Sequence, residues 1–138
     1  MYGPRQRPDL AIHKFARMIV EGKPIQMYGD GFSKRDYTYI ADVVNGLISA
    51  LKINDISYEI LNLGGGEPIE LCRMISALEN ALGKKAVVEK CPMQPGDVEK
   101  TSCDWTKAHL LLGYEPKTSF SDGIRHFVNW FNSGEKKR

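Results

Sequence analysis

The sequence has few cysteines and no long apolar run, and each shortage excludes a class of protein. Only three cysteines occur among 138 residues, namely Cys72, Cys91 and Cys103, and none belongs to a C-x-x-C pair. This spacing argues against zinc knuckles and redox motifs and favours a reducing compartment, so we expect a cytoplasmic protein. No apolar run approaches the about 20 residues of a membrane-spanning helix, so we expect no membrane partner.

Charge and the familiar catalytic motifs are also scarce. The net charge is only +2, which gives no sign of nucleic-acid binding. Neither G-x-G-x-x-G nor G-x-S-x-G occurs, so a dinucleotide loop and a nucleophile elbow are both missing. The histidines His13, His109 and His126 stand in predicted helices without metal-ligand spacing, and we expect them at helix surfaces or boundaries.

Five segments have the apolar periodicity of amphipathic helices. The first is predicted between Asp9, a candidate N-cap, and the stop signal Gly22. The others begin near Ile40, cover 71–82, cover 104–112 and cover 120–131. Their expected inward stripes include Ile12, Phe15, Ala16 and Ile19 in the first helix, Val44, Leu47, Ile48 and Leu51 in the second, and Ile124, Phe127, Val128 and Phe131 in the last.

Short strand-like runs alternate with these helices. "PIQMY" (24–28) and "RDYTY" (35–39) are joined by "GDGFSK", which allows a hairpin or a tight loop. "YEILNLGGG" (58–66) has the pattern of a buried strand that ends in a flexible turn, and "AVVEK" (86–90) follows as another strand. The chain therefore reads as one α/β domain, residues 1–138, with about five helices and several short strands.

Polar residues concentrate in the predicted turns and strand ends. Arginine suits bidentate contact with phosphate, tyrosine offers a face on which a base can stack, and aspartate or asparagine can bind ribose hydroxyls. A phosphate-bearing nucleotide would use all three kinds of residue. The residues concerned are Arg5, Arg7, Tyr28, Arg35, Asp36, Tyr37, Tyr39, Asn62, Gln94 and Asp97.

The order of the motifs resembles one protein family along nearly the whole chain. "YGPRQRPD", "YGDGFSKRDYTYIADVV", "ILNLGGGEP", "QPGDV" and "KAHLLLGYEPKTSFSDGI" follow one another. In series they resemble the C-terminal, substrate-binding part of extended short-chain dehydrogenases/reductases that act on nucleotide sugars with NAD. The likeness is greatest to UDP-glucuronate 4-epimerases and to UDP-glucose 4-epimerase-like proteins.

This resemblance implies a chain that starts within a sheet strand and lacks the NAD-binding Rossmann half. The complete enzyme would use NAD, whereas this chain would bind none by itself. No Tyr-x-x-x-Lys pair is present, so we expect the chain alone to be inactive. The resemblance also implies a UDP-sugar ligand. We further expect a homodimer or other self-association, in which the strand at 58–63 or the segment around Tyr2 pairs between chains.

By the same resemblance, three residues lie near the nucleotide's base and diphosphate. Arg35 in "RDY" would contact the diphosphate, and Asn62 matches an asparagine near it. Tyr28, before "GDG", would lie against the uracil ring.

Three further residues are assigned in this way. Asp97 in "PGD" matches a position that meets the ribose or a phosphate, and Gln94 replaces an arginine that many members carry. Arg7 in "RPD" matches an arginine close to the phosphate and sugar in the uronate enzymes. For Arg5, simple packing against the turn remains open. Asp36 and Asp42 are expected to be structural partners or caps.

Other readings of the chain remain open at this stage. It could be a non-catalytic nucleotide-binding or scaffold module. It could belong to a UDP-glucuronate decarboxylase or a nucleotide-sugar 4,6-dehydratase of the same family. It could also be an unrelated interaction domain. The motifs "RPD" and "QPGDV" are the only local hints for choosing between reactions.

Overall fold

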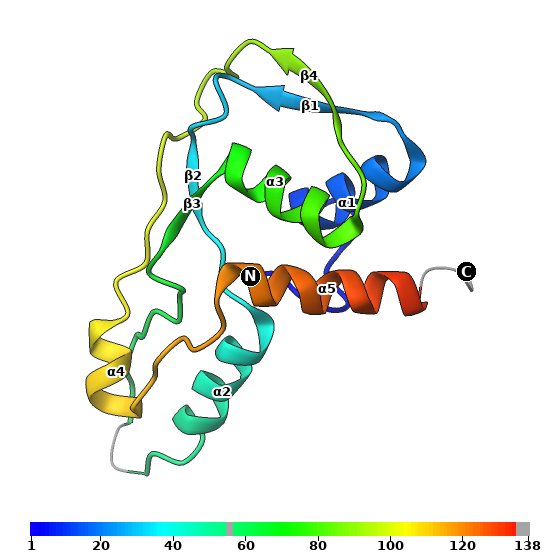
Figure 1. Cartoon of the computed structure of the whole chain (residues 1–138). Coiled ribbons are helices and arrows are strands. Elements are labelled where there is room, and N and C mark those ends of the chain that lie inside the picture. Colours follow the sequence, from blue (N-terminus) through cyan, green and yellow to red (C-terminus); the bar gives the residue numbers. More distant parts are fainter. Residues whose placement is uncertain (55–56, 135–138) are drawn as a thin grey trace.

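A computed structural model describes residues 1–54 and 57–134, within which five helices alternate with four short strands (Figure 1). This confirms the α/β class and the number of helices. The elements are α1 (Ala11–Glu21), β1 (Pro24–Tyr28), β2 (Lys34–Asp36), α2 (Ile40–Ala50), β3 (Pro68–Glu70), α3 (Leu71–Leu82), β4 (Val87–Cys91), α4 (Thr106–Leu112) and α5 (Phe120–Gly134). No helix among these residues is long and apolar enough to cross a membrane.

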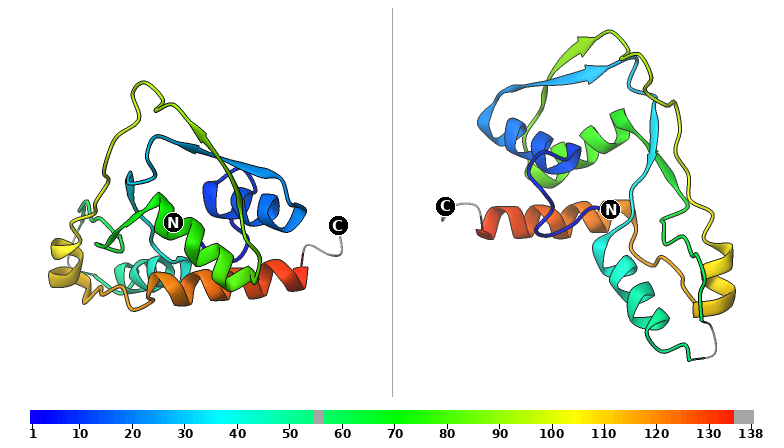
Figure 2. Two further views of the ribbon diagram at one scale, coloured as in Figure 1. Left: turned by 45° about the horizontal axis from the view of Figure 1, so that its top comes forward. Right: turned by 180° about the vertical axis from the view of Figure 1, so that it is seen from behind.

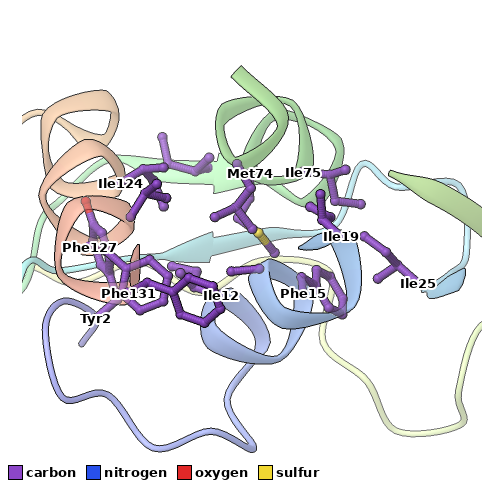
Figure 3. Packing of buried hydrophobic residues seen from close by; sticks show 14 of the residues in the cluster. Tyr2, Ile12, Phe15, Ile19, Ile25, Met74, Ile75, Ile124, Phe127 and Phe131 are labelled. Atoms are coloured by element: carbon purple, nitrogen blue, oxygen red, sulfur yellow. The ribbon is translucent and has the colours of Figure 1, made fainter. Parts of the chain in front are cut away.

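The hydrophobic core lies where α1, α3 and α5 meet beneath the β1–β4 pair, while α2 and α4 lie at the other end (Figures 1 and 2). Its members come from every one of these three helices and from β1 (Figure 3). The inward stripes predicted for the first and last helices are therefore confirmed. The fully buried side chains include Ile12, Ile19, Ile25, Met74, Leu78, Ile124 and Phe127.

His13 is buried in this core, which corrects the expectation of a surface position. Its Nδ1 lies 2.8 Å from the carbonyl oxygen of Gln6, and its ring packs edge-on against Phe127, Trp130 and Phe131. Periodicity places residue 13 beside the apolar stripe, and only the packing of α5 against α1 covers it.

The glycine stops are confirmed, but the first cap is not. Gly22, Gly83 and Gly113 each end a helix in the left-handed conformation that glycine adopts without strain. The N-cap of α1 is Leu10 rather than Asp9. The reason is that the Asp9 carboxylate accepts hydrogen bonds from the Arg7 guanidinium instead.

The two strands around "GDGFSK" do not form a hairpin. β1 pairs in parallel with β4, with Ile25 opposite Val88, whereas β2 pairs antiparallel with β3. Asp30 Oδ1 accepts the Phe32 N–H at 2.9 Å and closes a tight loop between the strands. The alternative of a tight loop was therefore right, because each strand finds its partner far away in the sequence.

Residues 58–66 form no strand, and the apolar stripe of α2 faces solvent; both findings correct the sequence prediction. Tyr58 and Ile60 are 79% and 67% exposed, and no described segment pairs with their backbone. A strand forms only where a neighbour accepts and donates its hydrogen bonds. On α2, Leu47 and Leu51 are 54% and 84% exposed, since α4 covers only another part of that helix.

Tyr2 connects the N-terminal segment to the start of α2 and to the start of α5. Its backbone N–H donates to Thr38 O, and its carbonyl accepts the Ile40 N–H, each at 2.8 Å. Its hydroxyl donates to Phe120 O at 3.2 Å, and its side chain is only 2% exposed. The segment around Tyr2 thus pairs within its own chain, whereas pairing between chains stays a prediction. Burial raises the pKa of the Tyr2 hydroxyl, and the nearby Tyr39, Asp42 and Asp122 raise it further.

We predict that Gly123→Ala destabilises the protein although alanine favours helices. A Cβ at residue 123 would overlap the hydroxyl and ring of Tyr2. Overpacking of this kind costs about 1–3 kcal/mol, against a gain of about 1 kcal/mol in helix propensity. Urea denaturation should show a lower midpoint. Gly134→Ala in the same helix serves as the control, because a Cβ there would meet Trp130 Nε1 only at 3.8 Å, an ordinary van der Waals distance; an equal effect of both changes would contradict the explanation.

Candidate functional site

A cavity of about 220 Å³ brings together three of the six residues assigned to the nucleotide sugar, Tyr28, Arg35 and Asp97. β1 contributes Tyr28, β2 contributes Arg35, and the loop after β4 contributes Asp97. One face of α1 forms the opposite wall, with Lys14 and Met18. With Leu71 at the start of α3, the cavity is therefore built from five segments that are separate in the sequence.

Arg35 is the central charged residue of this cavity. Its guanidinium forms an ion pair with Asp97, and Nη1 also donates to Lys34 O at 3.0 Å. The two side chains are 28% and 39% exposed, so solvent and ligands can reach the pair. Tyr28 donates from its hydroxyl to Gln26 Oε1 at 3.1 Å. A guanidinium beside an exposed cavity can bind phosphate or carboxylate oxygens.

Asp36, the residue after Arg35, holds the backbone around this site. Its carboxylate accepts N–H groups from Gly65 at 3.0 Å, from Gly66 at 2.9 Å and from Cys103 at 2.9 Å. Side chains alternate along a strand, so an inward Asp36 directs Arg35 to the opposite face. The structural role that the sequence predicted for Asp36 agrees with these contacts.

Asp42 has a similar role beneath α2. Its carboxylate is buried and accepts the backbone N–H groups of Lys117 and Thr118, each at 3.2 Å. Close by, Tyr114 donates from its hydroxyl to Gly64 O at 3.1 Å. Burial raises the pKa of Tyr114 to about 12, with smaller contributions from Asp42, Cys103 and Asp36. Both acidic side chains therefore bind backbone rather than ligand.

The other assigned residues lie apart from the cavity to different degrees. Gln94 is exposed, and its carbonyl accepts the Asp97 N–H at 3.2 Å in a turn, so it lies near one end. Arg7 forms an exposed ion pair with Asp9 and lines a separate cavity of about 450 Å³ beside Ile40. Asn62 donates to Asp104 O at 3.4 Å, on the side of α4.

Lys14 and Gln26 line the cavity but were missed by the sequence analysis. A signal for Lys14 was present. Residues 11, 14 and 18 repeat at helical spacing beside the apolar stripe of α1, so they share one face. The sequence does not show what that face borders, because β2 and the loop at 97 come from distant positions.

The glycine run at 64–66 does not fit the pyrophosphate of NAD. The Gly65 and Gly66 N–H groups, which would have to point at phosphate, are both bonded to the Asp36 carboxylate. A carboxylate there repels an anion. Burial, together with Asp36 and Asp104, also raises the pKa of the neighbouring Cys103 thiol. Within the residues that the structure describes, no cluster of three or more His, Cys, Asp or Glu side chains could hold a metal ion.

Comparison with known proteins identifies the family. The family model described as GDP-mannose 4,6 dehydratase matches residues 1–127. The chain belongs to this family of NAD-dependent nucleotide-sugar epimerases and dehydratases, as the order of its motifs predicted.

Two curated relatives show how much of such a protein the chain represents. The UDP-glucuronate 4-epimerase of Thermodesulfobacterium geofontis is 45% identical over 131 residues, which cover 94% of this chain and 40% of that protein. An uncharacterized protein of Methanocaldococcus jannaschii is 47% identical over 131 residues, which cover 95% and 40%. The chain therefore spans about two fifths of the length of these relatives.

Solved structures of two enzyme types have the same backbone. The UDP-glucuronic acid 4-epimerase of Bacillus cereus, in complex with UDP-glucuronic acid and NAD, gives a TM-score of 0.88 at 39% identity over 96% of this chain and 42% of that one. The dTDP-glucose 4,6-dehydratase of Bacillus anthracis, in complex with NAD, gives 0.86 at 26% identity over 98% and 43%. The backbone alone therefore does not choose between the two reactions.

We predict that Asp36→Asn destabilises the protein by about 2 kcal/mol. An amide keeps one acceptor oxygen but turns an NH₂ group toward a backbone N–H, so at least one charge-assisted hydrogen bond is lost. Urea denaturation measures the loss. Asp104→Asn is the matched control, because Asp104 accepts one exposed backbone N–H, from Thr106, at the start of α4. Equal losses in the two variants would show that the hydrogen bonds of the Asp36 carboxylate contribute no more stability than the single bond of Asp104.

Proposed function

We propose that this chain is a nucleotide-sugar-binding domain whose cavity at Arg35 binds the diphosphate side of a UDP-sugar. We further propose that it serves in an NAD-dependent 4-epimerisation of UDP-glucuronate, with UDP-glucose as the alternative substrate. The observation that carries the proposal is the convergence of Tyr28, Arg35 and Asp97 on one cavity. The names of the similar proteins support the class of substrate.

The charges of the cavity suit a diphosphate. Arg35 and Lys14 supply two positive charges from opposite walls, and Asp97 holds the Arg35 guanidinium in place until phosphate oxygens replace it. Tyr28 offers a ring beside them for the uracil. A volume of about 220 Å³ is below the about 300–1,000 Å³ of typical ligand pockets. The sugar and part of the nucleotide would therefore extend beyond it.

A role in the complete reaction needs groups that these residues do not supply. When bound, NAD accepts and returns the hydride, and the residues described here do not fit its pyrophosphate. Their part is to bind and orient the nucleotide. The inactivity of the 138 residues by themselves, with or without NAD, stays a prediction, as does the cytoplasmic location.

A nucleotide-sugar 4,6-dehydratase reaction remains the second candidate function, because the B. anthracis dehydratase has nearly the same backbone as this chain. The uronate reading is preferred because the "RPD" and "QPGDV" segments resemble those of the glucuronate enzymes, and because the identity to a UDP-glucuronic acid 4-epimerase is higher, 39% against 26%.

We predict that Arg35→Ala weakens UDP binding by about 1.5–3 kcal/mol, the value of one hydrogen bond to a charged group. Titration calorimetry with UDP measures both proteins. Arg125→Ala removes the same side chain from an exposed ion pair with Asp122 on α5 and should leave the affinity unchanged.

The outcomes separate the parts of this proposal. Equal affinity of the Arg35→Ala and unmutated proteins would remove Arg35 from the site. A loss of affinity in Arg125→Ala as well would indicate a general effect of charge. Absence of UDP binding to the unmutated chain would refute binding by this chain alone.

We propose also that the chain self-associates through the exposed stripe of α2, Val44, Leu47, Ile48 and Leu51, called here the α2 surface. This replaces the strand pairing that the sequence suggested. All four side chains are more than two fifths exposed, and they form one helical stripe. Contiguous apolar surface of this kind usually marks an association site.

Leu47→Lys should therefore shift the protein from dimer to monomer, because a charge would have to be buried in the contact. Light scattering coupled to size exclusion measures the mass. Leu110→Lys adds the same charge at an exposed leucine of α4 and should leave the dimer intact. A monomeric unmutated protein at high concentration would contradict the proposal.

A further inference from the structure

A second candidate site is a cavity of about 830 Å³ lined by residues of the N-terminal loop, α1 and the end of α5. Figure 2 shows the course of these three segments. Its walls include Arg5 and Gln6 from the loop, His13 and Arg17 from α1, and Trp130 from α5. Residues 13 and 17 are one helical turn apart and share a face, whereas Lys14 and Met18 face the cavity at Arg35. The two cavities therefore lie on different sides of α1.

The second cavity is electropositive. Arg5 and Arg17 come from different segments, and no hydrogen bond or ion pair connects either guanidinium to another of the described residues. The pKa of Glu21 is lowered chiefly by its hydrogen bond from Lys23 and only slightly by the charge of Arg17. No aspartate or glutamate stands among the described residues that line the cavity. An anion entering it would meet two guanidinium groups and no described carboxylate.

A buried acceptor without a partner indicates that this cavity holds a ligand. Gln6 Oε1 is buried and has no hydrogen-bond partner among the described residues, although buried acceptors are nearly always paired. Arg5 has a φ of 64°, the only positive value among the described non-glycine residues. Arg5 follows Pro4 in a turn that the Gln6 N–H closes on Gly3 O at 3.2 Å, and this turn places Arg5 at the cavity.

The remaining wall is aromatic and rigid. The Trp130 ring packs edge-on against the buried His13 ring, with ring centroids 5.7 Å apart. The carbonyl of Gln6 can only accept, so His13 Nδ1 carries the hydrogen of their 2.8 Å contact and ties the loop to α1. An indole beside two guanidinium groups and a lone acceptor is a mixed apolar and polar lining, as small-molecule sites have.

We propose that this cavity binds a hydroxylated phosphate ester, such as a sugar phosphate, separately from the UDP-sugar. Arg5 and Arg17 bind the phosphate oxygens, a ligand hydroxyl donates to Gln6 Oε1, and the apolar face of the ligand packs on Trp130. The volume of about 830 Å³ accommodates such a ligand. This site does not depend on the function proposed above.

Fluorescence of Trp130 tests the proposal. The protein has two tryptophans, so Trp105→Phe leaves Trp130 as the only reporter. Titration with glucose 1-phosphate should change its emission saturably, with inorganic phosphate binding more weakly because it lacks the sugar. In this background Arg17→Ala and Arg5→Gly should each weaken binding about tenfold or more, as expected for the loss of a charge-assisted contact. Glycine also keeps the positive φ at residue 5.

Lys14→Ala is the matched control, since it removes one positive charge from the other face of the same helix. It should leave glucose 1-phosphate binding unchanged, and saturating UDP should not compete. Calorimetry on the unmutated protein provides a readout that does not depend on Trp105→Phe.

Three results would overturn the proposal. One is the absence of saturable binding by either method up to about 10 mM, ten times the millimolar Kd of a weak site. Another is an equal loss in Lys14→Ala and Arg17→Ala. The third is competition by UDP, which would assign the ligand to the cavity at Arg35.

Discussion

The carboxylate of Asp36 accepts three backbone N–H groups from two distant segments, and the arrangement of the cavity at Arg35 depends on it. Gly65 and Gly66 come from one segment and Cys103 from the other. A charged acceptor gives each of these hydrogen bonds more strength than a neutral one would. Thr101, two residues before Cys103, accepts the Asp36 N–H with its hydroxyl at 3.1 Å. One side chain thus sets the position of β2 and hence of Arg35.

This constraint also explains why three glycines in succession need not be a phosphate loop. The N–H groups of Gly65 and Gly66 are already used, and the segment approaches Asp36 and Cys103 so closely that a side chain at Gly64 or Gly65 would collide with them. The run therefore serves packing. In our proposal, phosphate recognition falls instead to Arg35 and Lys14, which line the cavity.

The two ends of the molecule differ in how completely they are buried. Around Tyr2, three helices and β1 enclose a continuous core (Figure 3). Around α2, the apolar stripe that would be buried in a self-contained domain is exposed. Relatives are about two and a half times as long as the part they share with this chain, which covers about 40% of them. An apolar stripe without a cover is consistent with a surface that associates, here in our proposal with a second copy.

The sequence by itself determined the helices, their glycine stops and the family. Helix stripes and left-handed glycines depend on neighbours within a few residues, and the motifs occur in one order along the chain. Arg35 and Asp97 could be assigned singly for the same reason. Their mutual ion pair could not, because it joins residues 62 positions apart.

Only the tertiary structure decided which elements find partners. β1 and β2 each pair with a distant strand, and "YEILNL" finds none, although the sequence predicts a strand at all three. Burial likewise followed packing: His13 is covered because α5 crosses α1, and Leu51 is exposed because nothing in the described chain covers that side of α2. Local patterns specify what a residue can do, whereas pairing and burial depend on contacts between segments far apart in the sequence.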